Sequence, residues 1–371
     1  MNTMRTRITA LRQRLDYEAS RRGHLRMQAR NGGDGFALFG GFHARHRFAG
    51  MYLQKGQSLR TRVALHGPIT ADDCRALAAT YGLVVFCGHC APLGLEADVF
   101  RMPLTVDMDL SLPTSLDGSD WSRGAKANIA KIKRGEFRFD VVKPDRRTIA
   151  EFYRTMYSPS MRNRHGNAAY IPNETSLFKF LQDAGSEFLR VWQNNRWVAG
   201  ALTQSQSAGY QMAKLGWLSG DEPLLKSGVV ASIYWSTFQR AAALGYRRVL
   251  LGSVEPYLEN GVLRHKAHWG GELARNSRDY GEFQLLLEPS HPACRSFLER
   301  HSLISRGHDG DFIVFSTRTP NQQGVTRGLL KTIARWYVWR ETPTPESGLA
   351  NAEIPPGLRR WLAQAALPQS R

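Results

Sequence analysis

The sequence of 371 residues has little of several features that mark particular protein classes. It contains four cysteines, too few for a disulfide framework in a chain of this length. No stretch approaches the roughly 18 consecutive apolar residues of a membrane span, and the N-terminus lacks the apolar core of a secretory signal. We therefore expect a reduced, cytoplasmic protein that is not exported by that route.

Acidic residues are also scarce. The chain has 32 Asp and Glu against 50 Lys and Arg, which gives a formal net charge of +18. Such a charge attracts polyanions, namely nucleic acid, phosphorylated cofactors or anionic lipid surfaces. The first thirty residues hold eight arginines against Asp16 and Glu18 and look helical. This segment suits a transit peptide, a solvated basic helix, or a helix on an anionic membrane surface. The last of these would make the protein peripheral to the inner membrane.

The length predicts two domains, and the 42% hydrophobic content is enough for a sizeable core. Residues 31–111 contain short strands and a helix that begins near Thr70. Residues 112–318 predict the order β-α-α-β-β-β-α-β-α-β, which describes an α/β (α+β) fold with a mixed sheet flanked by helices on both faces. Residues 319–371 predict a basic, aromatic helix at "TRGLLKTIARWYVWR" (326–340) and then a loose tail.

The stretch "VLRHKAHWGGEL" (262–273) is unusual for a purely structural segment. It places Lys266 between two histidines and follows them with Trp269 and the glycine pair 270–271. Glycine pairs allow backbone to approach another group closely, and basic and aromatic groups beside them can hold a ligand. The alternative is a solvated basic loop with Trp269 packed beneath it. A metal site from the two histidines lacks a third ligand nearby, so we expect no metal.

Three stretches together resemble the GNAT acyltransferases, and in detail the Fem-type (FemAB-like) branch of that superfamily. They are "WSRGAKANIAKIKRGEFRFDVV", "LLKSGVVASIYWSTFQRAAALGYRRVLLGS" and "NGVLRHKAHWGGEL", the last being similar to the family's phenylalanine-lysine and glycine-glycine segment. The resemblance covers roughly residues 100–317. It implies transfer of an acyl or aminoacyl group to an amine, with residues 112–318 as the GNAT domain and 31–111 as a smaller, degenerate GNAT-like half.

The donor site implied by the resemblance lies at "PLLKSGVV" (223–230), where Lys226, Ser227 and Gly228 precede a long helix. Free N–H groups and the dipole at a helix start favour phosphate, and GNAT proteins hold the pyrophosphate of CoA there. The usual arginine/glutamine-x-x-glycine-x-glycine/alanine loop is absent, as in Fem-type members, which weakens the case for CoA. The alternative is that Ser227 is an ordinary helix cap.

The catalytic residues that the resemblance implies are Glu255, Tyr257, His265 and Lys266. Lys266 would neutralise phosphate or the developing oxyanion, and His265 or Glu255 would be the general base for the attacking amine. Tyr257 would donate a proton to the leaving group, and Trp269 would shape the pocket wall. The alternative for Glu255 and Tyr257 is a loop position beside Pro256.

The acceptor site is predicted in "MYSPSMRNRHGNAAYIP" (156–172), a long polar loop. Arg162, Arg164 and His165 would bind an anionic acceptor there, unless the loop is simply solvated. A separate motif, "CGHC" (87–90), has the spacing of a redox pair. Neither its flanking residues nor its position match a disulfide isomerase, and coincidence at a strand end is the preferred interpretation.

These observations lead to one main hypothesis and two alternatives. The main one is an acyltransferase that uses acyl-CoA such as acetyl-CoA as co-substrate, with no permanently bound cofactor. Its acceptor would be a small molecule, glycan or peptide of the cell envelope or of exopolysaccharide, attacked directly because no nucleophile–base pair stands out. The first alternative is a Fem-type transferase that uses aminoacyl-tRNA. The second is a non-catalytic GNAT-like binder of RNA or anionic lipid. We expect no DNA partner.

Overall fold

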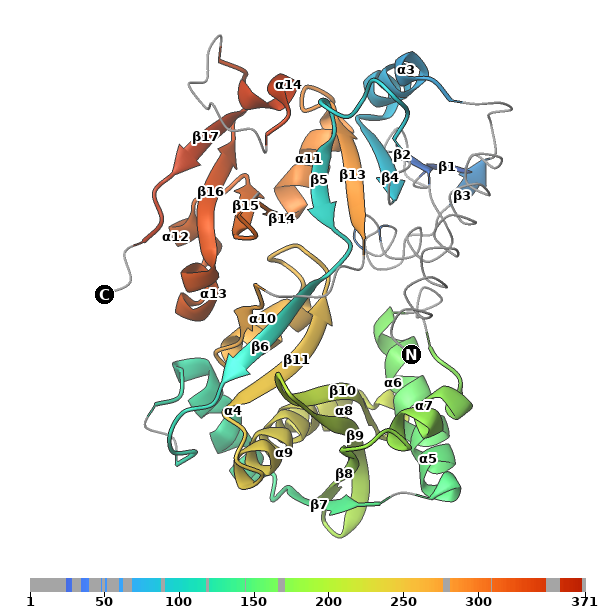
Figure 1. The fold of residues 1–371 in the computed structure, drawn as a ribbon, viewed down its shortest axis with the longest axis vertical. Coiled ribbons are helices and arrows are strands. Elements are labelled where there is room, and N and C mark those ends of the chain that lie inside the picture. The colour runs from blue at the N-terminus through green and yellow to red at the C-terminus, as the bar shows by residue number, and fades with distance from the viewer. Residues whose placement is uncertain are drawn as a thin grey trace.

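The computed structural model describes residues 25–28, 35–39, 48, 51, 60–62, 69–87, 91–117, 120–143, 145–165, 171–275, 281–307, 309–344 and 354–368. Their strands form three sheets. Figure 1 shows the largest sheet in the lower half of the molecule and the other two side by side in the upper half. None of the helices in these ranges is long and apolar enough to cross a membrane.

The largest sheet has seven strands in the order β12-β6-β11-β10-β9-β8-β7. The strands are β6 (Val106–Ser111), β7 (Arg138–Val142), β8 (Ser186–Gln193), β9 (Arg196–Gln206), β10 (Gly209–Trp217), β11 (Arg248–Val254) and β12 (Glu272–Leu273). All neighbours pair antiparallel except β10 and β11, which are parallel. The sheet is therefore mixed.

Helices cover both faces of this sheet. They are α4 (Arg123–Arg134), α5 (Arg146–Phe152), the π-helix η1 (Tyr153–Tyr157), α6 (Ser158–His165), α7 (Glu174–Leu181), η3 (Leu218–Gly220), α8 (Glu222–Ser227), α9 (Val229–Ala243) and α10 (Gly261–His268). In β8, Leu189 packs with α4, α9 and α10, whereas its neighbour Phe188 packs with α5, η1 and α7. Adjacent strand residues point to opposite faces, so these two groups of helices lie on opposite sides of the sheet.

The six-stranded sheet has the order β3-β1-β2-β4-β13-β5. Its strands are β1 (Leu25–Gln28), β2 (Gly35–Phe39), β3 (Arg60–Arg62), β4 (Leu83–Cys87), β5 (Phe100–Pro103) and β13 (Glu282–Leu287). Helices α3 (Ala71–Tyr81) and α11 (Pro292–Arg300) cover opposite faces, because α3 packs on Val84 and Phe86 while α11 packs on Leu83 and Val85.

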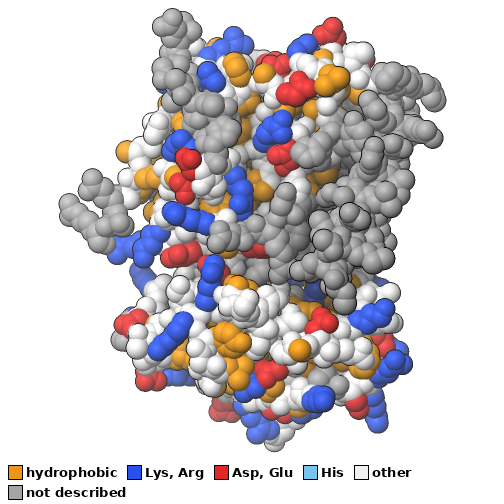
Figure 2. Space-filling view, viewed as in Figure 1, with side chains coloured by type: hydrophobic (Ala, Val, Ile, Leu, Met, Phe, Trp, Pro, Cys, Tyr) orange, Lys and Arg blue, Asp and Glu red, His pale blue; other side chains and the backbone are white. Residues whose placement is uncertain are grey.

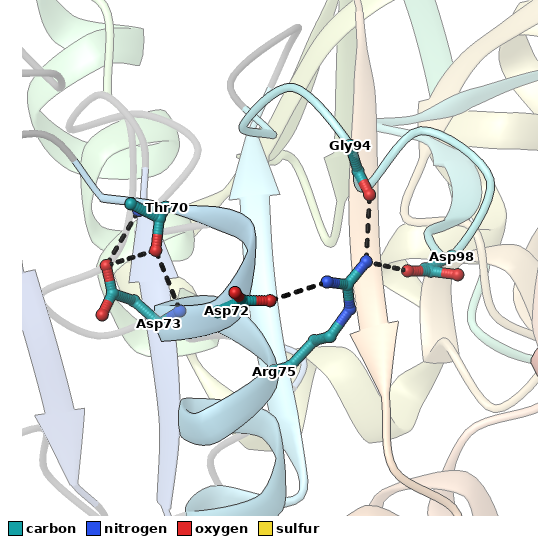
Figure 3. A network of polar contacts seen from close by, with 6 residues as sticks. All are labelled: Thr70, Asp72, Asp73, Arg75, Gly94 and Asp98. Carbon is teal, nitrogen blue, oxygen red and sulfur yellow. Dashed lines mark hydrogen bonds and ion pairs between the residues drawn. The ribbon is translucent and has the colours of Figure 1, made fainter.

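Helix α3 begins where the sequence predicts it. Thr70 accepts a hydrogen bond from the Asp73 N–H, and the Asp73 carboxylate accepts from the Thr70 N–H, which is a capping box. Arg75 then ties the helix to the following loop through Asp98, at 2.9 Å, and the carbonyl of Gly94, at 3.0 Å (Figure 3). These exposed contacts fix where the chain enters the six-stranded sheet.

The four-stranded sheet, β14-β15-β16-β17, packs against both of the other two. Its strands are β14 (Leu303–Arg306), β15 (Phe312–Ser316), β16 (Ile333–Trp339) and β17 (Leu362–Ala365), and the helices beside it are α12 (Pro320–Gln323), α13 (Arg327–Thr332) and α14 (Pro356–Arg359). Ile304 and Trp336 pack with the core of the seven-stranded sheet, whereas Leu303 and Tyr337 pack with the core of the six-stranded sheet. The small sheet therefore joins the two larger ones.

The predicted fold class, a mixed sheet with helices on both faces, is confirmed. The strand that was predicted to close the first half, 103–111, instead pairs with β11 as β6 of the seven-stranded sheet. Conversely, β13 was predicted with the second half but pairs with β4 and β5. Alternation in the sequence indicates a strand, but the partner depends on contacts far along the chain. The division into domains and the degenerate first half stay predictions.

The C-terminal prediction was wrong. The expected helix at 326–340 is a short helix, α13, followed by the strand β16, and the expected loose tail contains α14 and β17, which pairs with β16. Ile333–Trp339 is rich in β-branched and aromatic residues, which favour strands. At the other end, 25–28 is a strand rather than helix. Residues 1–24 of the predicted basic helix lie outside the described residues.

Candidate active site

The two parallel strands of the large sheet separate partway along their length. β10 and β11 pair only at Tyr210 with Val249 and at Gln211 with Leu250. Directly after these pairs each strand has an irregularity, between Met212 and Lys214 in β10 and between Leu250 and Gly252 in β11. Beyond this point β10 stays paired with β9, and β11 stays paired with β6. Two matched bulges thus open the sheet between two central strands.

Lys266 lies at this opening and is 3% exposed. Its ammonium group donates hydrogen bonds to the carbonyls of Gly252, at 2.8 Å, and Ser253, at 3.2 Å. Successive carbonyls of a regular strand point to opposite edges. Here Gly252 has a φ of +75°, a conformation that glycine adopts readily, and both carbonyls face Lys266. The lysine therefore bonds to a strand segment at the place where β10 has moved away.

Burial and a shortage of nearby acid govern the charge of Lys266. Removal from water lowers its pKa to about 7, the Asp107 carboxylate opposes this shift, and Arg164 adds to it. Asp107 itself accepts a hydrogen bond from the Ser253 hydroxyl at 2.7 Å. At neutral pH this lysine thus lies near the midpoint of its titration, unlike a solvated lysine.

Lys266 is positioned by helix α10, which was not predicted as a helix. Asn260 caps it, because its Oδ1 accepts hydrogen bonds from the N–H groups of Val262 and Leu263, both at 2.9 Å. At the other end, a Cβ on Gly271 would come within 2.8 Å of the Lys266 carbonyl oxygen. Gly271 therefore lets the chain turn tightly against the end of α10.

Glu255 and Tyr257 lie just before α10 in the chain, and Glu255 follows by two residues Ser253, whose carbonyl accepts a hydrogen bond from Lys266. The Nδ2 of Asn260 donates to the Glu255 carboxylate and, at 3.5 Å, to the Tyr257 hydroxyl. Burial and the charge of Glu255 raise the pKa of Tyr257 to about 12. The Tyr257 ring meets His301 edge-on at 5.1 Å. The four predicted catalytic residues thus form two pairs, at the two ends of one short helix.

His265 lies beside Lys266 and stays uncharged. Burial, followed by the charges of Arg164, His268 and Lys266, lowers its pKa to about 4. Its ring meets Tyr234 of α9 edge-on, with 4.8 Å between centroids. Its Nε2 atom is buried and has no hydrogen-bond partner within the described part of the chain. A neutral imidazole with an unused nitrogen suits a ligand contact or a proton acceptor.

Arg164 reaches the same place from α6. The predicted polar loop over 156–172 is helical up to 165, with the π-helix η1 leading directly into α6. Pro159 has no backbone N–H to donate to a regular helix. It lies in the first turn of α6, directly after the wider turn of the π-helix. The Arg164 guanidinium carbon lies 5.8 Å from the ring centre of Trp217 at the end of β10.

The position of α6 is fixed by close contacts with the end of β10. The Ser160 hydroxyl bonds both the N–H and the carbonyl of Trp217, each at 3.0 Å. Asn163 donates to the carbonyl of Ser219 at 3.2 Å. A Cβ on Gly216 would lie 2.6 Å from the Cα of Tyr157, so only glycine allows this approach. Arg164 is therefore an exposed side chain on a firmly docked helix.

The predicted donor residues are arranged differently from expectation. Gly228, with a φ of +104°, is the residue that precedes α9, and no side chain caps this helix. The Ser227 hydroxyl donates to the Leu224 carbonyl at 2.8 Å, so it is not the cap. Lys226 pairs with Glu222 at 3.0 Å on the surface. Lys131 of α4 also lies at this helix start, because its side-chain carbons would be 3.2 Å from a Cβ on Gly228.

Three predicted residues and one motif remain. Arg162 is exposed, and nothing is described of the His165 side chain. Trp269 is 1% exposed and packs against Trp121 and Phe238, so it belongs to the core. In "CGHC", residues 88–90 lie outside the described residues. Among the residues that are described, no three His, Cys, Asp or Glu side chains are grouped as metal ligands.

Sequence reasoning missed three residues that organise the site. Asn260 stands before a segment that was not seen as a helix, although asparagine is a common N-cap and could have signalled it. Trp217 and Tyr234 were not singled out in the sequence. Nothing in the sequence shows that Arg164 reaches Trp217 and that His265 reaches Tyr234 from other elements.

Comparisons with known proteins add fold-level similarity only. No family model matches the sequence, and no curated protein matches it. Among solved structures, the chain is similar to the C-terminal domain of a putative lysylphosphatidylglycerol synthetase from Agrobacterium fabrum, at 13% identity and a TM-score of 0.34, covering 78% of this chain and 92% of that one. It is similar to FemX at 11% identity and a TM-score of 0.36, covering 74% and 90%.

A GCN5-related N-acetyltransferase from Sphaerobacter thermophilus is similar at 13% identity and a TM-score of 0.29, covering 55% of this chain and 58% of that one. With TM-scores below 0.5 and such low identities, none of these similarities determines what this chain does. The candidate site must therefore be judged by its own geometry.

Proposed function

We propose that this chain is an acyltransferase that moves an acyl group from acyl-CoA to an amine of a polar, anionic acceptor. The observation that carries the proposal is the opening between β10 and β11, with the buried Lys266 bonded to the carbonyls of Gly252 and Ser253. At the opening, the facing edges of β10 and β11 no longer pair with each other. Main-chain groups on such edges can bind an extended ligand as a further strand would.

In the proposed reaction the amine nitrogen attacks the thioester carbonyl carbon directly. A C–N bond forms and the C–S bond breaks, while one proton leaves the nitrogen and one is taken up by the departing thiolate. Glu255, held by Asn260, accepts the proton from the amine. Tyr257 keeps its proton because its pKa is raised to about 12, and it donates to the leaving sulfur. Holding the amine and the thioester close together within the opening supplies the rest of the rate acceleration.

The donor phosphates would lie at the start of α9. The first N–H groups of a helix have no partner within that helix, and together with the helix dipole they attract anions. Lys131 of α4 lies over Gly228 at this point and provides a mobile positive charge. In this proposal Lys131 takes the role that the sequence suggested for Lys226, which pairs with Glu222.

A second candidate is an aminoacyl-tRNA donor in place of acyl-CoA. The helices α4, α9 and α10, which share one face of the sheet, contain eight Lys or Arg residues and no Asp or Glu. A helical layer without acid suits a polyanion. The same layer would serve a non-catalytic binder of RNA or anionic lipid, which would show no transfer with any donor.

Thermal unfolding with added ligands separates these candidates. We expect acetyl-CoA and desulfo-CoA to raise the midpoint in a saturable way that persists at high salt, because binding to the native state stabilises it. Lys131→Gln should weaken this shift, whereas Lys133→Gln, two residues along the same helix and exposed, should not. A salt-sensitive shift with bulk tRNA and none with either CoA compound would replace the proposal by the second candidate.

A further inference from the structure

Three cationic or potentially cationic side chains converge beside the opening from two elements that are far apart in sequence. Arg164 comes from α6, and His265 and Lys266 come from α10. Arg164 lies close enough that its charge lowers the pKa of His265 and of Lys266. The ring of Tyr234 meets that of His265 edge-on at 4.8 Å. Tyr234 is 2% exposed and uncharged, because burial raises its pKa.

No carboxylate forms an ion pair with this group within the described part of the chain. Arg164 takes part in none of the ion pairs found there. The carboxylate that acts on Lys266 is Asp107, which is bonded to the Ser253 hydroxyl on the strand side of the lysine. The charges that act on His265 are all positive, namely Arg164, His268 and Lys266. The side facing α6 therefore carries uncompensated positive charge.

Two features show that this place is prepared for a ligand. The Arg164 guanidinium lies over the ring of Trp217, and the helix that carries it, α6, is docked on β10 through Ser160. The buried Nε2 of His265 has no hydrogen-bond partner among the described residues. Leaving a buried polar atom without a hydrogen bond is unfavourable, and a bound group that bonds to it would remove that cost.

We propose that Arg164 and His265 form a subsite that binds an anionic group, a carboxylate or a phosphate, of the acceptor. This inference rests on the proposed function, since it places the acid end of the acceptor beside the opening that would hold the acyl group. The guanidinium donates to the anion, and His265 donates through Nε2 after taking one proton from solvent. The nearby charge of Lys266 adds to the attraction. Binding therefore takes up protons and strengthens as the pH falls.

Small anions test the subsite without any acyl donor. The probes are sulfate, for a phosphate group, and malonate, for a carboxylate, titrated at constant ionic strength against the unfolding midpoint. Lys and Arg side chains are spread over the viewed face of the molecule (Figure 2), so weak binding elsewhere must be subtracted. Arg164→Gln is therefore compared with Arg162→Gln, which removes the same charge from an exposed position on the same helix.

We expect Arg164→Gln to weaken the affinity for one of the probes roughly tenfold or more, the scale of a charge-assisted hydrogen bond, and Arg162→Gln to leave it within about twofold. The wild type should bind more tightly at pH 5.5 than at pH 7.5, and His265→Gln should reduce this difference. The probe that binds more tightly identifies the class of anion.

Equal losses in the two arginine variants would overturn the proposal, as would a His265→Gln variant with wild-type affinity and pH dependence. Arg164 is exposed, so its variant should fold even if that of His265 does not. The outcome is independent of the proposed function: if anion binding depends on Arg164 but no acyl transfer to any amine is found, only the proposed function fails.

Discussion

At the scale of single residues, Lys266 is the most informative group in the molecule. A solvated lysine has a pKa of about 10.4, whereas burial lowers that of Lys266 to about 7. The unfolded chain therefore binds this proton more tightly than the folded chain does. The free energy of unfolding should consequently rise as the pH increases from about 7 to about 10. Below about pH 7 the lysine is charged in both states, and the folded state carries the full cost of burying that charge.

Replacing Lys266 by methionine tests this reasoning. Lys266→Met should flatten the increase in unfolding free energy between pH 7 and pH 10, by up to roughly 1.4 kcal/mol per pH unit, because the titrating group is gone. Urea denaturation at four pH values in this range measures it. Lys226→Met, which removes an exposed lysine, is the control and should run parallel to the wild type. A Lys266→Met curve that also runs parallel would mean that Lys266 titrates normally.

At the scale of elements, the site depends on how α6 and α10 are placed against the separated strands. Helix α10 is held by its cap at Asn260 and by the close turn at Gly271. Helix α6 is held by Ser160 and by the near contact of Gly216 with Tyr157. A π-helix commonly marks a functional place, and here it precedes the helix that carries Arg164.

The contact at Gly216 gives a prediction for this scale. Gly216→Ala should destabilise the protein by about 1–3 kcal/mol, the usual cost of overpacking, because its Cβ would meet the backbone of Tyr157 at 2.6 Å. It should also weaken anion binding, since α6 must shift. Gly261→Ala, whose Cβ meets nothing within 4 Å, is the matched control in thermal unfolding. Equal midpoints for the two variants would show that α6 is not fixed by this contact.

At the scale of the whole molecule, the four-stranded sheet connects the two larger sheets. Its residues belong to both large hydrophobic cores, with Trp336 in one and Tyr337, its neighbour in β16, in the other. The six-stranded sheet also needs β13, which returns to it after the chain has built the seven-stranded sheet. Neither large sheet is therefore independent of the C-terminal strands.

This arrangement predicts a single unfolding transition. Trp336 is fully buried, and its indole N–H donates to the Arg318 carbonyl at 2.8 Å. Trp336→Ala should lower the one midpoint, with a loss of about 3–5 kcal/mol, as measured by calorimetry and by far-ultraviolet circular dichroism together. Trp192→Ala, at a less buried position near the sheet edge, should cost less. Two transitions, with only one of them moved by Trp336→Ala, would contradict the coupling.

Local patterns in the sequence determined much of this protein by themselves. The capping box at Thr70, the strands of the large sheet and the apolar stripe of α9 all follow from neighbouring residues, because caps and hydrophobic periodicity act over one or two turns. The place of Lys266 as a residue of interest also came from its immediate neighbours in the motif. Those neighbours did not show that Lys266 donates hydrogen bonds to two carbonyls of β11.

Only the tertiary structure decided which elements meet. It paired β6 with β11 and β13 with β4, separated β10 from β11, and turned the predicted C-terminal helix into β16. It also brought the charge of Arg164 close to His265, about a hundred residues later in the chain. Strand pairing and burial depend on contacts between distant parts of the chain, and the free energy of such contacts is not written in any local stretch of sequence.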